Sequence, residues 1–128
     1  MQMRIKNLLQ ANAYLIATGL TAFIAYLSLD SFSEINMPID NFDKVFHSLA
    51  YFFLALSWFF AVEKSHSIFK YRIVVAFLVI IFGIIIEVLQ SSLTTYRTAD
   101  YYDIMANSFG ILIAMVLFNR LLRLYNTI

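Results

Sequence analysis

The sequence has no cysteine, one proline and three glycines among its 128 residues. Without cysteine the chain can form no disulfide, no thiolate metal site and no acylated lipobox cysteine. Charged residues are also scarce, at 13% of the chain, whereas 62% of the residues are hydrophobic. This composition excludes an ordinary soluble domain and predicts a small membrane protein with a single domain over residues 1–128. No glycine-rich phosphate loop and no basic patch with interleaved aromatic residues is present, so neither nucleotides nor nucleic acids are expected as partners.

Long, nearly uncharged runs divide the chain into four segments. Each is close to the length of about 20 residues that a helix needs to cross the hydrocarbon core of a bilayer. The third run is rich in Ile and Val, but lipid requires backbone groups to bond within the segment, which favours a helix. A basic segment before the first run is also typical of a signal peptide, but the run is long for one and lacks a cleavage site. We therefore expect an all-α, polytopic four-helix membrane bundle with spans at about 11–29, 45–62, 73–90 and 103–120.

The nine basic residues are distributed unevenly between the segments that flank the spans. With a cytoplasmic N-terminus, seven fall on the inner side and only Lys44 and Arg97 fall outside. Because basic flanking residues favour the cytoplasm, we expect both termini inside. The same orientation places the start of the second helix, the end of the third and the start of the fourth at the outer face.

Polar residues recur at helical spacing at these three helix ends. They form one stripe on each helix: Asp43, His47 and Tyr51; Glu87 and Gln90; Asp103, Asn107 and Gly110. Residues three or four apart share one helix face, so the three stripes can converge into a polar cleft that opens outward. Below this cleft, small residues would let a neighbouring helix approach closely: Ala106, Gly110 and Ala114.

Ionisable residues inside a membrane span are costly and usually functional. His47 could act as a general base or acid, with Glu87 orienting it and Arg97 stabilising developing negative charge. The candidate catalytic residues are His47, Glu87 and Asp103, and the candidate ligand-binding residues are Asp43, Lys44, Tyr51, Gln90, Arg97 and Asn107. No G-x-S-x-G, no H-E-x-x-H and no convincing nucleophile is present, so the sequence leaves open whether a reaction takes place.

Other interpretations of these residues remain open. Glu87 could be a buried carboxyl that bonds to His47 or Asn107 and holds the bundle together. Asp43 could cap a helix, and Lys44 or Arg97 could bind any lipid phosphate. A mixed nitrogen and oxygen set of His47, Glu87 and Asp103 could bind a divalent cation, but we expect no metal and no cofactor.

The combined pattern resembles the VanZ-like family of small bacterial membrane proteins. It reads Asp-Lys-x-x-His-x-x-x-Tyr from Asp43, then Glu87-x-x-Gln90, then Arg97, then Asp103-x-x-x-Asn107-x-x-Gly110. The resemblance covers residues 42–114 and implies a single VanZ-like transmembrane domain in the inner membrane of a bacterium. The protein that gives the family its name is associated with low-level resistance to the glycopeptide teicoplanin, so the resemblance implies a role in the cell envelope rather than a particular reaction.

Two functions follow as expectations. In the first, the outward-facing site binds or processes a charged envelope amphiphile, either a lipid phosphate or a lipid-linked cell-wall precursor, with a link to glycopeptide tolerance. In the second, the chain is a structural or accessory membrane protein whose polar residues fix helix packing or bind a partner, such as another membrane protein or a second copy of the chain. A transporter is less expected, because four helices leave little room for a pore.

Overall fold

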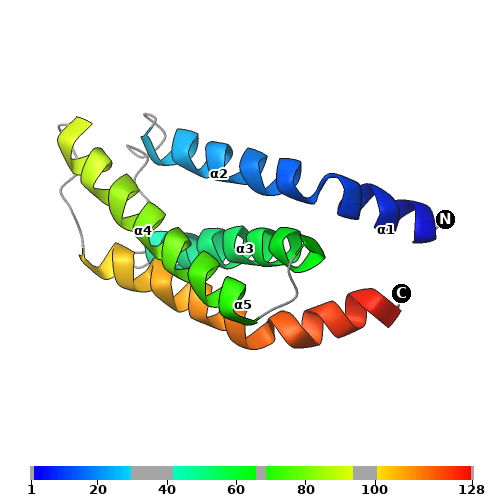
Figure 1. Ribbon diagram of the computed structural model, residues 1–128. Helices are drawn as coiled ribbons and strands as arrows, with labels where there is room; N and C mark the ends of the chain where they lie inside the picture. The colour runs from blue at the N-terminus through cyan, green and yellow to red at the C-terminus, as the bar shows by residue number, and fades with distance from the viewer. Residues whose placement is uncertain (1, 30–41, 66–68, 94–100, 128) are drawn as a thin grey trace.

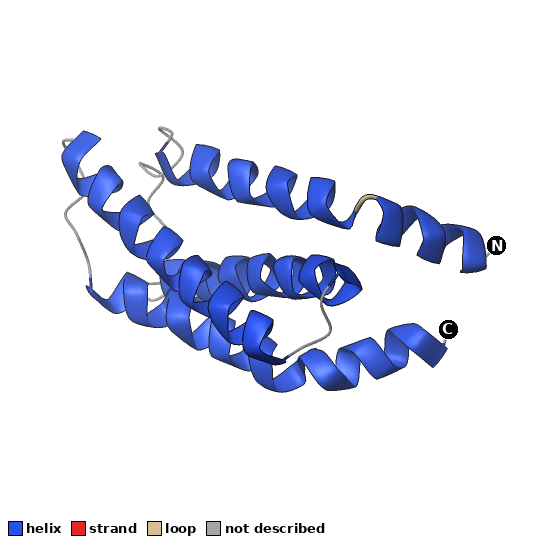
Figure 2. Cartoon of the chain, in the orientation of Figure 1, coloured by secondary structure: helices blue, strands red, loops and turns tan. Residues whose placement is uncertain are grey.

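The structure is a computed structural model, and it describes residues 2–29, 42–65, 69–93 and 101–127. Within this part the chain is helical throughout, apart from a single-residue break at Asn12 (Figure 2). The helices are α1 (Gln2–Ala11), α2 (Ala13–Leu29), α3 (Phe42–Ser65), α4 (Phe69–Leu93) and α5 (Tyr101–Thr127) (Figure 1). The expected all-α fold is confirmed.

Three helices, α3, α4 and α5, are long and apolar enough to cross a membrane. A fourth span exists if α1 and α2 are counted together, but these two helices meet at an angle of 62°. The expected segments 45–62, 73–90 and 103–120 all lie inside longer helices. The apolar runs underestimate these lengths because a helix continues into the polar flanks, where its backbone bonds remain internal.

The break at Asn12 was not expected from the sequence, and neither was the helix that precedes it. The Asn12 side-chain amide donates to the carbonyl oxygen of Leu8 at 2.8 Å, and the Asn12 backbone N–H donates to the same oxygen at 3.1 Å. Asparagine side chains that bond to nearby backbone groups compete with regular helix geometry. Residues Gln2–Ala11 therefore form a separate short helix instead of an extension of the first span.

Helix α3 lies at the centre of the bundle and contacts α2, α4 and α5. Its closest neighbour is α5, because Gly110 lies against the backbone of Ser48 with no room for a side chain. Ala114 is fully buried one turn further along, and the Ser48 hydroxyl donates to the carbonyl oxygen of Ala106 at 2.9 Å. The small residues of α5 thus allow the close approach that the sequence predicts. The buried core around this contact comprises Ile24, Tyr51, Leu54, Ala55, Phe59, Ala76, Val79, Ile111, Ala114 and Phe118.

The two ends of the bundle differ in the elements that they bring together (Figure 1). Both termini lie at one end, together with the end of α3 and the start of α4. The opposite end collects the end of α2, the start of α3, the end of α4 and the start of α5. This arrangement places the three predicted polar stripes at one end of the molecule.

Candidate functional site

An ion pair joins α3 and α5 at the end of the bundle opposite the termini. The Lys44 ammonium donates to Asp103 Oδ1 at 2.7 Å. Asp103 is almost fully buried, whereas about a quarter of the Lys44 side chain is exposed. Asp103 lies in the first turn of α5, where the positive end of the helix dipole stabilises a carboxylate. The Lys44 ammonium and the dipole of α5 therefore both stabilise the carboxylate, and the ammonium is the partly exposed member of the pair.

His47 lies one turn below Lys44 on α3, and both of its ring nitrogens face groups on α5. Nδ1 lies 3.1 Å from Asn107 Oδ1, and Nε2 lies 3.7 Å from Asp103 Oδ2. The second distance exceeds a hydrogen bond. A proton on Nδ1 would donate to Asn107, and a proton on Nε2 would be attracted by the Asp103 carboxylate. Among the described residues, only Nδ1 of the two ring nitrogens therefore has a hydrogen-bond partner.

Deeper in the bundle, Tyr51 and Asn107 meet α4 at Gly83. A methyl group at Gly83 would lie 3.1 Å from both Asn107 Nδ2 and Tyr51 Cε1. The Tyr51 side chain is 2% exposed, and its hydroxyl has no hydrogen-bond partner in the part of the chain that the structure describes. A buried polar group without a partner is rare in native structures and needs a specific explanation.

Glu87 is the buried carboxyl that α4 contributes to the site. It lies one turn from Gly83 toward the end of α4, is 2% exposed, and interacts electrostatically with the Tyr51 hydroxyl. Tyr51 follows Lys44 by seven residues, which corresponds to about 10 Å along a helix. The site therefore has a shallow layer that contains Lys44, Asp103 and His47, and a deeper layer in which Tyr51 and Asn107 meet Gly83.

Gln90 is also buried, but its amide binds a different helix. Its Nε2 donates to the carbonyl oxygen of Ser28 at 2.6 Å, which ties the end of α4 to the end of α2. The sequence places Gln90 on the same face as Glu87. In the structure, the described hydrogen bond of Gln90 joins α4 to α2.

Comparison with known proteins identifies the family of this chain. The sequence matches the VanZ/LLP1 family over residues 4–123. The chain belongs to this family. The match extends beyond residues 42–114, on which the resemblance in the sequence rests, and it includes most of α1 and all of α2. Neither the curated proteins nor the solved structures provide a match.

Two predicted site residues of this VanZ/LLP1 protein are not described in full. Arg97 lies outside the described residues, and Asp43 lies in the first turn of α3 with a side chain that is outside the description. The structure brings together the other predicted residues that act between α3, α4 and α5: Lys44, His47, Tyr51, Glu87, Asp103 and Asn107.

The metal alternative finds no support in this geometry. Within residues 2–29, 42–65, 69–93 and 101–127, no three histidine, aspartate or glutamate side chains lie close enough to hold a metal ion together. His47 and Asp103 are neighbours, but among the described residues Glu87 does not form a group of three possible ligands with them.

A second polar cluster lies at the end of the bundle that holds the termini. It was not predicted from the sequence. Arg72 donates to Glu63 Oε2 from Nη2 at 2.8 Å and from Nε at 3.2 Å, and it donates from Nη1 to Asn119 Oδ1 at 2.6 Å. Its guanidinium also stacks 4.7 Å from the centre of the Phe118 ring. The sequence does contain a signal for this cluster, because Glu63 and Arg72 carry opposite charges on the two sides of a short connector. The prediction used Arg72 only as a basic flanking residue and did not pair it with Glu63.

Proposed function

We propose that this VanZ/LLP1 protein binds the anionic headgroup of an envelope amphiphile in the site between α3, α4 and α5. The observation that carries the proposal is the buried Tyr51 hydroxyl, which lies beside Glu87 and has no partner among the described residues. A phosphate oxygen or a ligand hydroxyl that enters between the helices would supply the missing hydrogen bond. The acyl or prenyl chain would then lie along the apolar surfaces of the helices.

The shallow layer provides the charges for such a headgroup. Lys44 is partly exposed and paired with Asp103, so an incoming phosphate can replace Asp103 as the partner of the ammonium. The released carboxylate remains beside His47 Nε2, where it stabilises an imidazolium. Arg97, from the polar segment between α4 and α5, would add a planar donor suited to phosphate. The ligand classes that fit are a lipid phosphate and a lipid-linked cell-wall precursor.

The orientation of the chain belongs to the same proposal. Both termini lie at one end of the bundle (Figure 1), and seven of the nine basic residues flank the spans at that end. Basic residues favour the cytoplasmic side, so the site opens to the outer face of the bacterial inner membrane. Lipid-linked cell-wall precursors are used at that face, and a site there would account for a link to glycopeptide tolerance. Altered teicoplanin susceptibility on deletion of the gene tests that link.

A chemical step at the site would use His47 as the proton-transfer group. Asp103 orients the imidazole and stabilises its protonated form, and Glu87 acts from α4. An Asp103→Asn variant that still folds but no longer turns over the bound lipid would support catalysis. Unchanged turnover in this variant would remove Asp103 from that role.

The proposal is tested by identifying lipids that remain bound to the purified protein. Native mass spectrometry of the parent should show one phosphate-bearing lipid class, and matched Glu87→Gln and Arg97→Ala variants should lose it while they remain folded. Equal, heterogeneous lipid in all three proteins would contradict the proposal.

A structural role is the second candidate, and one observation favours it. Each polar contact described at the site also joins two helices: Lys44 with Asp103, His47 with Asn107, and Gln90 with Ser28. If these contacts only fix the packing, variants at the site should lower stability in proportion to the bonds lost. Tyr51→Phe, which loses no described bond, should then have no effect.

A further inference from the structure

A pocket of about 180 Å³ lies at the end of the bundle that holds the termini, far from the site described above. Three helices form its walls, and its lining combines apolar and polar side chains: Gln10, Phe60, Glu63, Leu122, Tyr125 and Asn126. Its volume is roughly six times the space of about 30 Å³ that one water molecule occupies in the liquid. The pocket is therefore large enough for a small polar headgroup.

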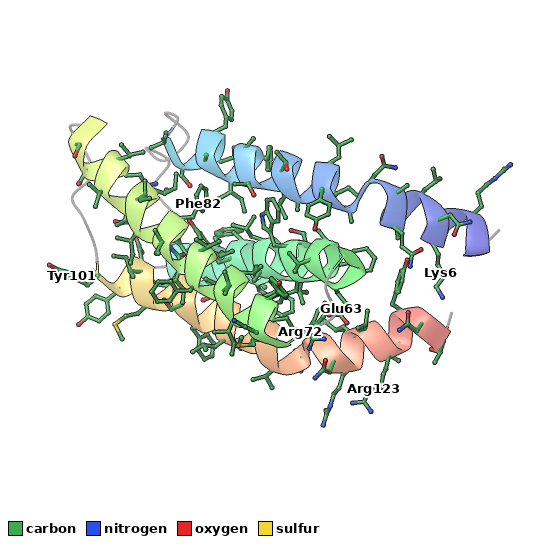
Figure 3. All side chains as sticks on the ribbon, viewed as in Figure 1. Lys6, Glu63, Arg72, Phe82, Tyr101 and Arg123 are labelled. Carbon is green, nitrogen blue, oxygen red and sulfur yellow. The ribbon has the colours of Figure 1, made fainter. Side chains whose placement is uncertain are left out.

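Helix α1 is held over this pocket by contacts with the end of α5. The Tyr125 hydroxyl donates to the carbonyl oxygen of Lys6 at 3.2 Å, and the Lys6 ammonium donates to the carbonyl oxygen of Asn126 at 3.4 Å. The same ammonium lies 5.0 Å from the centre of the Tyr125 ring. Figure 3 shows Lys6 directed from α1 toward α5. The 62° bend after Ala11 thus places a half-buried cation beside the pocket.

The α3 wall contributes a carboxylate oxygen that is available to a ligand. Both hydrogen bonds from Arg72 to Glu63 end on Oε2, and Oε1 has no partner among the described residues. Arg72 itself does not line the pocket, because its guanidinium is directed toward Asn119 and Phe118. Figure 3 shows Glu63 and Arg72 side by side at this end of the bundle. The pocket therefore offers an acceptor on α3 and a cation on α1.

We propose that this pocket binds the zwitterionic aminoalkyl phosphate headgroup of a phospholipid such as phosphatidylethanolamine. The phosphate would lie on Lys6, with the side-chain amides of Gln10 and Asn126 as donors. The ammonium would lie on Glu63 Oε1, beside the aromatic rings of the pocket, whose faces attract cations. A purely anionic headgroup would leave Glu63 facing a like charge, and a purely cationic ligand would face Lys6.

The surroundings of the pocket favour a membrane lipid over a soluble aminoalkyl phosphate. Phe60 and Leu122 form an apolar part of the lining, which suits the glycerol and the first carbons of the acyl chains. Large apolar side chains are exposed on the two helices that border the pocket: Ile5, Leu8 and Leu9 on α1, and Leu121 and Leu124 on α5. The acyl chains can follow these surfaces into the bilayer.

The test is retention of lipid by the purified protein after exposure to mixed micelles with equal amounts of phosphatidylethanolamine and phosphatidylglycerol. Native mass spectrometry should show phosphatidylethanolamine retained about tenfold more than phosphatidylglycerol, the ratio expected for one charge-assisted hydrogen bond. Glu63→Gln should abolish that preference, because Glu63 is the proposed partner of the ammonium, which phosphatidylglycerol lacks. Lys6→Met should lower the retention of both lipids, because both carry the phosphate. The glutamine still accepts a hydrogen bond from Arg72, so its variant keeps a bond between α3 and α4.

Arg4→Met and Arg120→Met serve as matched controls, because both residues are exposed cations outside the pocket lining. They should retain the parent preference. Equal retention of the two lipids by the parent, or the same loss in the controls as in the pocket variants, would overturn the proposal. A second arm adds lipid-free phosphoethanolamine at the same concentration: weak competition supports a lipid ligand, and competition as strong as that of the intact lipid would overturn it.

Discussion

At the scale of single residues, the site contains two kinds of polar group. Lys44, His47, Asp103 and Asn107 have described partners on a neighbouring helix, so each can serve packing and binding together. The Tyr51 hydroxyl is buried and has no partner among the described residues. Substitution of Tyr51 therefore separates a structural role from a binding role more cleanly than substitution of the paired residues.

We predict that Tyr51→Phe leaves the stability of the ligand-free protein unchanged or slightly raised. The substitution removes a buried hydroxyl that has no described partner, and its desolvation costs about 1–3 kcal/mol when it is unsatisfied. Thermal unfolding of delipidated protein in detergent measures the change. A loss of more than about 1 kcal/mol would mean that the hydroxyl has a partner within the protein.

The Lys44–Asp103 pair should show energetic coupling in a double-mutant cycle. We expect Asp103→Asn to cost more in the parent than in a Lys44→Met background, with a coupling free energy of about 0.5–3 kcal/mol, as for other residues in direct contact. Asp103 is buried and forms an ion pair with Lys44, so the lysine loses an ionic partner when the carboxylate is removed. Chemical unfolding of the four proteins in detergent gives the coupling, and additive effects would show that the pair is not coupled.

At the scale of helices, the contact between α3 and α5 determines the geometry of the site. Gly110 faces the backbone of Ser48, two turns along α5 from Asp103. A wider separation of α3 and α5 would break both the contact of Lys44 with Asp103 and that of His47 with Asn107. The packing of small residues below the site is thus a condition for the site itself.

Gly110→Ala should destabilise the protein by about 1–3 kcal/mol or more, the usual cost of overpacking a core. The new methyl group would overlap the carbonyl oxygen of Ser48, which is a backbone atom and cannot rotate away. Gly19→Ala is the matched control, because a methyl group there meets nothing within 4 Å. That control should be neutral or stabilising by up to about 1 kcal/mol, since alanine loses less backbone entropy than glycine in a helix. Equal effects of the two substitutions in a thermal unfolding assay would contradict the packing described here.

The Arg72 cluster should behave as a buried ion pair that fixes the start of α4. Arg72→Met leaves Glu63 without its partner and should cost about 3–5 kcal/mol, the range for removal of one member of a buried pair. The double substitution Glu63→Gln with Arg72→Met should recover most of this loss, because no uncompensated charge remains. Urea unfolding compares the single and double variants. A double variant as unstable as Arg72→Met alone would show that the charges are not the source of the cost.

At the scale of the whole molecule, the sequence predicts the helices well and their ends poorly. The long apolar runs identify α2 to α5, and the polar stripes identify side chains that meet across helices, including His47 with Asn107 and Lys44 with Asp103. Helical spacing assigns residues to a face of a helix but does not identify the helix that this face meets. The spacing therefore groups Gln90 with Glu87, whereas the Gln90 amide donates to α2. The bend at Asn12 depends on a side-chain bond to the backbone, which hydrophobic runs do not report.

The proposed orientation is a property of the whole chain and has a direct test. A reporter fused after Ile128 should be active only if it functions in the cytoplasm, because the basic residues gather at the end of the bundle that holds both termini. Activity of a periplasmic or extracellular reporter at the same position would reverse the orientation and place the site at the cytoplasmic face.

The central claim is that the site between α3, α4 and α5 recognises the charged headgroup of an amphiphile. The most direct measurement compares the shift in melting temperature caused by a polyprenyl phosphate with that caused by the corresponding polyprenol, which has the same chain and no phosphate. We expect the phosphate to stabilise the parent protein, as any ligand that binds only the native state must. We expect the alcohol to have little effect, and Tyr51→Phe and Lys44→Met to lose the response to phosphate. Equal shifts with the two lipids, or a full response in both variants, would contradict this claim.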